Sequence, residues 1–180
     1  MIRKHKTVKI VVSGDGGVGK TSFLNRLVNN HFNDENELTK GVDFFSKIIQ
    51  VNGTEYNFIL WDFAGQTQFK EILDNFVDGS IAALILFDLS RINTIETVLN
   101  WIDKLKQFGS IPILILGTKM DLIDSKNTKL IDDYINEVIE GYENVYDYIK
   151  ISSKTGDNIN QAFLSLIRKI SQLENKESYI

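Results

Sequence analysis

The sequence of 180 residues contains no cysteine, which excludes disulfide bonds, cysteine-ligated metal centres, thiol nucleophiles and prenylation of this sequence. Long apolar runs are also missing, because the longest, residues 81–87, is far short of the ~20 residues that span a bilayer. Ile2 stands where N-myristoylation needs a glycine, and no cleavage region follows the basic residues 3–6. We therefore expect a cytoplasmic protein without a transmembrane segment.

An excess of positive charge is absent as well. Lys and Arg number 20 against 24 Asp and Glu, which gives a net charge of −4, so the chain lacks the basic field of a dedicated nucleic-acid binder. With 43% apolar residues it is not a disordered chain, and at this length it can bury roughly 70% of its unfolded surface. We expect a single domain over residues 1–180, with a short basic extension at 1–6 and a short tail at 174–180.

Short β-rich runs alternate with amphipathic stretches, and no repeat or linker divides them. Continuous apolar runs predict parallel strands covered on both faces at residues 8–12, 81–87 and 111–116. Residues 44–51 and 56–60 meet across Asn52-Gly53, which predicts an antiparallel hairpin, and a sixth strand is expected at 145–151. Apolar faces predict helices over residues 23–28, 95–105 and 159–170. The pattern predicts a three-layer α/β domain with a six-stranded, mostly parallel sheet and helices on both faces.

A glycine-rich loop follows the first predicted strand. Residues 14–21 read Gly-Asp-Gly-Gly-Val-Gly-Lys-Thr, which fits the G-x-x-x-x-G-K-[ST] motif and leads into a predicted helix. Glycines let several backbone N–H groups face phosphate oxygens at the positive end of the helix dipole. Lys20 supplies charge for the β- and γ-phosphates, and the Thr21 hydroxyl can ligate Mg²⁺. The motif predicts a site for nucleotide phosphates and does not identify the base.

Two further loops should lie at the same edge of the sheet. After the third strand, Asp62 can hold Mg²⁺ through water, Gly65 can offer its N–H to the γ-phosphate, and Gln66 can orient an attacking water. After the fifth strand, Asp121 can accept two hydrogen bonds from guanine, which adenine cannot supply. A carboxylate left unpaired against adenine predicts discrimination of about 10⁴-fold. Lys119 can lay its aliphatic stem along the base.

These segments resemble the Ras superfamily of small GTPases in order and spacing, over essentially the whole chain. The resemblance rests on the phosphate loop, on Trp-Asp-x-Ala-Gly-Gln at residues 61–66, and on Thr-Lys-x-Asp at 118–121 followed by Ser-Ser-Lys at 152–154. Residues 38–44 resemble the Rab-type T-x-G-x-D-F segment. The P-loop NTPase fold is therefore expected.

The resemblance implies roles for individual residues. Thr39 would ligate Mg²⁺ only when a γ-phosphate is present, Phe32 would pack on the guanine edge, and Gly16 would leave room for hydrolysis. The metal ligands would be Thr21, Thr39 and, through water, Asp62. The catalytic residues would be Gln66, Lys20, Gly65 and Thr39. The residues expected to bind GTP or GDP are Gly14, Asp15, Gly16, Gly17, Val18, Gly19, Lys20, Thr21, Ser22, Phe32, Thr39, Gly65, Thr118, Lys119, Asp121, Ser152, Ser153 and Lys154.

The function implied is a monomeric molecular switch that hydrolyses GTP with Mg²⁺. Residues 32–45 and 63–78 would be the switch regions that meet a GTPase-activating protein, an exchange factor and effectors. No arginine matches the first switch, so slow intrinsic turnover is expected. Thr118 in place of the usual Asn, Phe63 in place of Thr, and Thr67 in place of Glu depart from the family pattern. The C-terminal cysteine of the usual lipid anchor is absent, so membrane association would be peripheral and depend on partners.

Two alternatives remain open from the sequence. A P-loop ATPase or small-molecule kinase would leave Asp121 and the Ser-Ser-Lys segment without a role. A scaffold that binds nucleotide with little hydrolysis would contain the same motifs, but Gln66 would have no catalytic role in it. His5 and His31 lack partners at metal-site spacing and are expected at the surface or in packing. Trp101 is expected to pack in the core. Trp61 is also expected there, with a place at the effector face as the alternative that the resemblance implies.

Overall fold

The computed structural model describes residues 4–33, 39–51, 53–63 and 77–177. The strands are β1 (Lys4–Gly14), β2 (Val42–Val51), β3 (Thr54–Phe63), β4 (Ala82–Asp88), β5 (Ile113–Thr118) and β6 (Val145–Lys150). The α-helices among the described residues are α1 (Lys20–Asn29), α3 (Ile95–Lys106), α4 (Ser125–Ile139) and α5 (Ile159–Glu177). Two 3-10 turns, Ile92–Thr94 and Met120–Leu122, follow β4 and β5.

The strands form one six-stranded sheet in the order β2-β3-β1-β4-β5-β6. β2 and β3 pair in an antiparallel hairpin, and the pairs β1–β3, β1–β4, β4–β5 and β5–β6 are parallel. The expected α/β class with one antiparallel strand is confirmed. Since the strands other than β2 point the same way, the loops that follow them emerge at one edge of the sheet.

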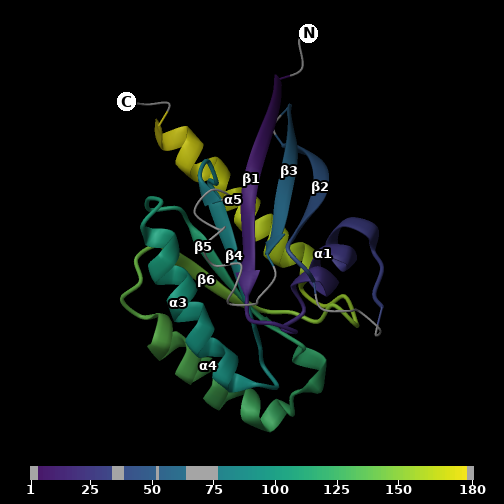
Figure 1. The fold of residues 1–180 in the computed structure, drawn as a ribbon, viewed down its shortest axis with the longest axis vertical. Helices are drawn as coiled ribbons and strands as arrows, with labels where there is room; N and C mark the ends of the chain where they lie inside the picture. Colours follow the sequence, from purple (N-terminus) through teal and green to yellow (C-terminus); the bar gives the residue numbers. More distant parts are fainter. Residues whose placement is uncertain (1–3, 34–38, 52, 64–76, 178–180) are drawn as a thin grey trace.

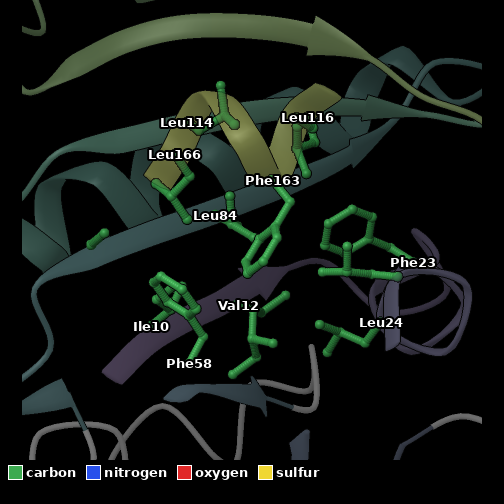
Figure 2. Packing of buried hydrophobic residues seen from close by; sticks show 14 of the residues in the cluster. Ile10, Val12, Phe23, Leu24, Phe58, Leu84, Leu114, Leu116, Phe163 and Leu166 are labelled. Atoms are coloured by element: carbon green, nitrogen blue, oxygen red, sulfur yellow. The ribbon is translucent and has the colours of Figure 1, made fainter. Parts of the chain in front are cut away.

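Two apolar clusters cover the two faces of the sheet. On one face, α1 and α5 pack against side chains of alternating strand positions; Figure 2 shows Phe23 and Leu24 of α1 and Phe163 of α5 meeting Ile10, Val12, Phe58, Leu84, Leu114 and Leu116. On the other face, residues of α3 and α4 pack against the intervening positions, among them Val11, Ile85 and Ile115. The three-layer prediction holds, and Figure 1 shows α5 running across the strands.

Element bounds differ from the expected ones by a few residues. β4 begins at Ala82, and Ile81 is 38% exposed, because Ile81 lies before the stretch that is covered on both sides. β5 begins at Ile113, and Pro112, which has no N–H to give, contributes its carbonyl to Ala83 N. Helix α4 carries no expectation from the sequence, since its apolar residues are interrupted by charged ones.

Residues near both ends of the chain belong to regular secondary structure that the sequence does not predict there. Residues 4–6, expected in a solvated extension, belong to β1, where they pair with β3. Glu174, expected in the tail, lies within α5, and its carboxylate accepts hydrogen bonds from Lys6 Nζ at 2.8 Å and from Tyr56 Oη at 2.9 Å. These contacts join the start of β1 to the end of α5, and both elements extend further than the sequence predicts.

Both tryptophans pack as expected, to different extents. Trp101 on α3 is buried in the second cluster. Trp61 on β3 is partly buried, stands edge-on to Phe44 of β2 with 4.5 Å between ring centroids, and has Lys9 Nζ 4.0 Å from its ring centroid. Within the described part of the chain, no helix combines the length and apolar character needed to cross a membrane.

Candidate functional site

The carboxyl ends of five parallel strands bring the predicted motifs together. β1 ends at Gly14 in the phosphate loop, β3 carries Asp62 next to its last residue, and β4 ends at Asp88. β5 ends at Thr118, and the loop beginning at Ile151 follows β6. One edge of the sheet therefore carries the loops that the sequence assigns to phosphate, metal and base.

The phosphate loop needs glycine at two positions for different reasons. Gly14 has a φ of 140°, and a Cβ there would lie 2.2 Å from the carbonyl oxygen of Leu86 on the neighbouring strand. Gly19 has a φ of 95° and is the N-cap of α1, so its left-handed backbone turns the chain into the helix. The loop can therefore pass close to β4 and present its N–H groups at the start of α1.

Lys20 points back into the loop that precedes it. Its Nζ donates to the carbonyl oxygens of Gly14 at 3.1 Å and of Asp15 at 2.8 Å. Desolvation by burial lowers the pKa of Lys20, and the charges of Asp62 and Asp15 act against this shift. Among the described residues, this buried ammonium is held by carbonyl dipoles and by more distant carboxylates, which suits it to an anionic ligand such as a phosphate group.

The remaining loop residues are placed around this lysine. Asp15 Oδ1 accepts the Gly16 N–H at 2.7 Å, Gly17 is exposed with a φ of 69°, and Val18 is fully buried. A Cβ on Gly16 would meet no atom of the described residues within 4 Å, so nothing in that part of the chain fills the space beside the loop. Ser22 lies in the first turn of α1.

Thr21, Thr39 and Asp62 converge from three separate segments. Thr21 Oγ1 donates to Asp62 Oδ2 at 2.5 Å and lies 2.6 Å from Thr39 Oγ1. Asp62 is fully buried, and its Oδ1 has no hydrogen-bond partner among the described residues. Burial raises the pKa of Asp62 to about 6, although the Thr21 hydrogen bond and the Lys20 charge lower it.

The donor chemistry of this group fits Mg²⁺. An unpartnered buried carboxylate oxygen beside two hydroxyls is an arrangement of hard oxygen ligands, which Mg²⁺ prefers. Among the described residues, no three His, Asp or Glu side chains gather as a metal site of their own. A divalent ion here would therefore depend on hydroxyls, water and ligand phosphates for most of its coordination.

The expected base-reading residues lie in two adjacent loops. Ser152 Oγ donates to Asp121 Oδ1 at 2.6 Å, which joins the loop after β6 to the loop after β5. Ser152 is fully buried and Asp121 is exposed, so the carboxylate faces outward while its partner is fixed inside. Lys119 has a left-handed backbone with a φ of 59°, and its Nζ lies 2.7 Å from Asp88 Oδ2.

Thr118 faces the interior of the protein. Its hydroxyl lies 2.6 Å from the carbonyl oxygen of Val18 and 2.9 Å from that of Phe87, and its single proton is shared between them. The side chain thus connects the loop after β5 directly to the phosphate loop. Phe32 is partly buried after α1, Ser153 is buried, and Lys154 is exposed. Gly65 and Gln66 lie outside the described residues.

Asp88 and Arg91 are functional candidates that sequence reasoning missed. Asp88 is fully buried and accepts hydrogen bonds from Ser90 N and Oγ and from Arg91 Nε, in addition to the Lys119 ion pair. Burial alone raises the pKa of Asp88, but the hydrogen bonds from Lys119, Ser90 and Arg91 outweigh burial and hold its pKa below the ordinary value. Arg91 Nη2 also donates to the Gly16 carbonyl at 3.2 Å. The available signal was an acidic residue at the carboxyl end of a fully apolar strand.

Comparison with known proteins agrees with this geometry. A model of the Ras family matches residues 9–172, which is most of the chain. The chain belongs to the Ras family.

Individual Ras-family relatives match over nearly the same length. The chain is 32% identical to Ras-related protein Rab-22A of Homo sapiens over 169 residues, which cover 92% of this chain and 84% of that protein. It is 31% identical to Ras-related protein YPTC6 of Chlamydomonas reinhardtii over 94% of this chain and 77% of that protein. It is 30% identical to Ras-related protein Rab-4A of Rattus norvegicus, also over 94% of this chain and 77% of that protein. The names of these relatives support a Rab-like small GTPase of the Ras family.

Proposed function

We propose that this protein is a guanine-nucleotide switch that binds GTP or GDP with Mg²⁺ and hydrolyses GTP. The observation that carries the proposal is the direct connection between the phosphate loop and the base-reading loops. Thr118 Oγ1 lies 2.6 Å from the Val18 carbonyl, and Met120 N donates to the Ile151 carbonyl at 3.1 Å. A nucleotide whose phosphates lie on residues 14–21 would therefore meet Asp121 with its base.

Guanine is the base that suits Asp121. The carboxylate is an acceptor only, and it can pair with the N1–H and the 2-amino group of guanine. Adenine offers an acceptor at N1, so binding it would leave the carboxylate unpaired against a lone pair. Ser152 supports this role because its hydrogen bond uses one lone pair of Asp121 Oδ1, which orients the carboxylate and leaves lone pairs on both oxygens for the base.

Thr21, Thr39 and Asp62 are proposed to hold Mg²⁺, Asp62 through water. When bound, the ion would neutralise charge on the phosphates. The link between Thr21 and Thr39 supports a coupling between this site and the first switch, because Thr39 lies between α1 and β2 in the segment assigned to that switch. Loss of the γ-phosphate would take away the proposed coordination of the ion by Thr39, and the first switch could then change its position.

Hydrolysis is proposed to depend on positioning and electrostatics. Gln66 would orient the attacking water, the Gly65 N–H would bind the γ-phosphate, and Lys20 with the loop amides would stabilise charge in the transition state. We expect slow intrinsic turnover, and an arginine supplied by an activating protein would add about 10³ to 10⁵ in rate. Residues 32–45 and 63–78 are the proposed contact regions for that protein, for exchange factors and for effectors.

The test combines affinity with turnover. Titration with GTP, GDP and ATP should give much tighter binding of the guanine nucleotides, and tighter ATP binding would replace this proposal with a P-loop ATPase or kinase. Phosphate release from GTP should fall in Gln66→Leu while GTP affinity is retained. Equal rates in the two proteins would favour a nucleotide-binding scaffold with little hydrolysis.

A further inference from the structure

Arg26 makes an unusual set of contacts next to the base-reading loops. It is partly buried on α1, and its Nε donates to the Ser153 carbonyl at 2.7 Å while Nη2 donates to the Lys154 carbonyl at 2.6 Å. Its Nη1 reaches the carbonyl of Asn30 at 3.3 Å. One rigid guanidinium thus holds two consecutive carbonyls of the loop after β6 and the residue that ends its own helix.

The contact at Lys154 continues toward Asp121. The Lys154 carbonyl belongs to the same planar peptide unit as the Thr155 N–H, so the orientation of one fixes the other. Thr155 N donates to Ser152 Oγ at 3.1 Å, and Ser152 Oγ donates to Asp121 Oδ1 at 2.6 Å. Because hydrogen bonds in series polarise one another, the arginine charge strengthens each donor along this path.

The other contacts close the same loop. Gly156 N donates to the Ser152 carbonyl at 2.9 Å, which fixes the peptide unit that carries the Ser153 N–H. Arg26 Nε fixes the next peptide unit, which carries the Lys154 N–H. Asn30, the C-cap of α1, has a left-handed backbone with a φ of 51° and directs the chain toward Phe32.

We propose that Arg26 is a positioning residue for base recognition. It acts through the Thr155 amide and the Ser152 hydroxyl to fix the direction of the Asp121 carboxylate. The proposal rests on the proposed function, since it concerns how the guanine base is read. A merely structural role would stabilise the protein without changing which base it prefers.

The experiment measures release of GDP and of inosine diphosphate, which lacks the 2-amino group and so loses one of the two hydrogen bonds to Asp121. Arg26→Gln should release GDP about tenfold faster than the unsubstituted protein, as expected when one hydrogen bond to the base is weakened. Release of inosine diphosphate should change much less, so the preference for GDP over inosine diphosphate narrows. Arg168→Gln, which removes an exposed arginine from α5, is the matched control and should leave both rates unchanged.

A double-variant comparison tests the path itself. In Ser152→Ala the connection to Asp121 is already broken, so adding Arg26→Gln should not narrow the preference further. Arg26→Lys, which keeps the charge but reaches one carbonyl rather than two, should fall between the two proteins. If Arg26→Gln fails to fold, Arg26→Lys carries the same comparison.

Three outcomes are distinguishable. An unchanged preference for GDP over inosine diphosphate in the Arg26 variants, with or without a lower melting temperature, overturns the positioning role. Additive effects of Arg26→Gln and Ser152→Ala overturn the path through Ser152. If the unsubstituted protein binds ADP as tightly as GDP, the proposed function itself fails, whatever the Arg26 variants do.

Discussion

Replacing Asp62 by Asn should make the metal-free protein more stable at neutral pH. Asp62 is fully buried, and burial raises its pKa from 3.8 to about 6. A carboxylate with a raised pKa binds more protons in the folded than in the unfolded state between these two values. The free energy of unfolding therefore carries no penalty from Asp62 below pH 4, where the carboxyl is protonated. It falls as pH rises from 4 through about 6, where the carboxyl of the folded protein ionises. Above pH 6 the charged carboxylate lowers the free energy of unfolding by ~3 kcal/mol, because each unit of difference between the folded and unfolded pKa values corresponds to about 1.36 kcal/mol.

The assay is urea unfolding of both proteins from pH 3.5 to 8, after removal of metal and nucleotide with chelator and phosphatase. The free energy of unfolding of Asp62→Asn minus that of the unsubstituted protein should be constant below pH 4, rise between pH 4 and 6, and reach up to ~3 kcal/mol at neutral pH. Taking this difference cancels groups such as Asp88, whose lowered pKa acts with the opposite sign. Thr21 can donate to an amide oxygen as it does to Asp62 Oδ2, so the substitution preserves that contact.

Mg²⁺ provides the second half of the test. The ion should raise the stability of the unsubstituted protein above pH 6, where it binds the ionised carboxylate, and should have a much smaller effect on Asp62→Asn. A difference in unfolding free energy that does not change with pH would refute the reasoning, because it would mean that the buried carboxylate keeps its ordinary pKa. Equal stabilisation of both proteins by Mg²⁺ would remove Asp62 from the metal site.

Three further substitutions test the base, the phosphate loop and the core. Asp121→Asn should weaken GTP binding by about 10²-fold or more and favour xanthosine triphosphate, whose 2-oxo group can pair with an amide; unchanged GTP affinity by titration contradicts base reading by Asp121. Gly16→Val should keep the melting temperature, since a Cβ there meets no atom of the described residues, yet it should slow single-turnover GTP hydrolysis by about 10²-fold. A normal rate would mean that the side chain added at Gly16 does not reach the reacting groups. Phe163→Ala should lower the free energy of unfolding in urea by about 3–5 kcal/mol, because Phe163 is 2% exposed and stands edge-on to Phe58. Leu164→Ala, at the neighbouring residue that is 46% exposed, should lower it by about 0.5 kcal/mol or less.

The sequence predicts the sheet well because its central strands are buried on both faces. β4 and β5 read as unbroken apolar runs, and the Asn-Gly turn identifies the one antiparallel pair. Helix α4 received no predicted bounds because its apolar residues are interrupted by charged ones, although Ile135 is fully buried against the sheet and Ile131 is partly buried. The first residues of β1 and the last turns of α5 were missed because their order depends on contacts between chain ends 168 residues apart.

The motifs at the site were predictable because each is continuous in sequence and ends a strand. The contacts that hold these motifs together could not be predicted, because they join residues that show no local sequence pattern. Asp88 is the last residue of β4 and Arg91 lies just after it, with no motif around them, and Arg26 lies on an amphipathic helix where an arginine is ordinary. The sequence signal for Asp88 was its place at the end of an apolar strand, and the roles of all three residues follow from their partners: Lys119 for Asp88, the Gly16 carbonyl for Arg91, and the carbonyls of Ser153 and Lys154 for Arg26.

The supporting contacts divide the site into a rigid part and a part that depends on ligand. Thr118, Arg91 and Arg26 each tie a loop proposed to bind the base or the phosphates to the rest of the protein through backbone carbonyls, and these contacts are made without a nucleotide. By contrast, Thr39 is held at the site through the Thr21 hydroxyl, which also serves the buried Asp62 carboxylate. Since a metal ion would compete for both hydroxyls, we propose that the segment around Thr39 is the part of the site whose position the nucleotide and its ion can change. A switch requires this division, because the base must be held in both states while Thr39 is held in only one.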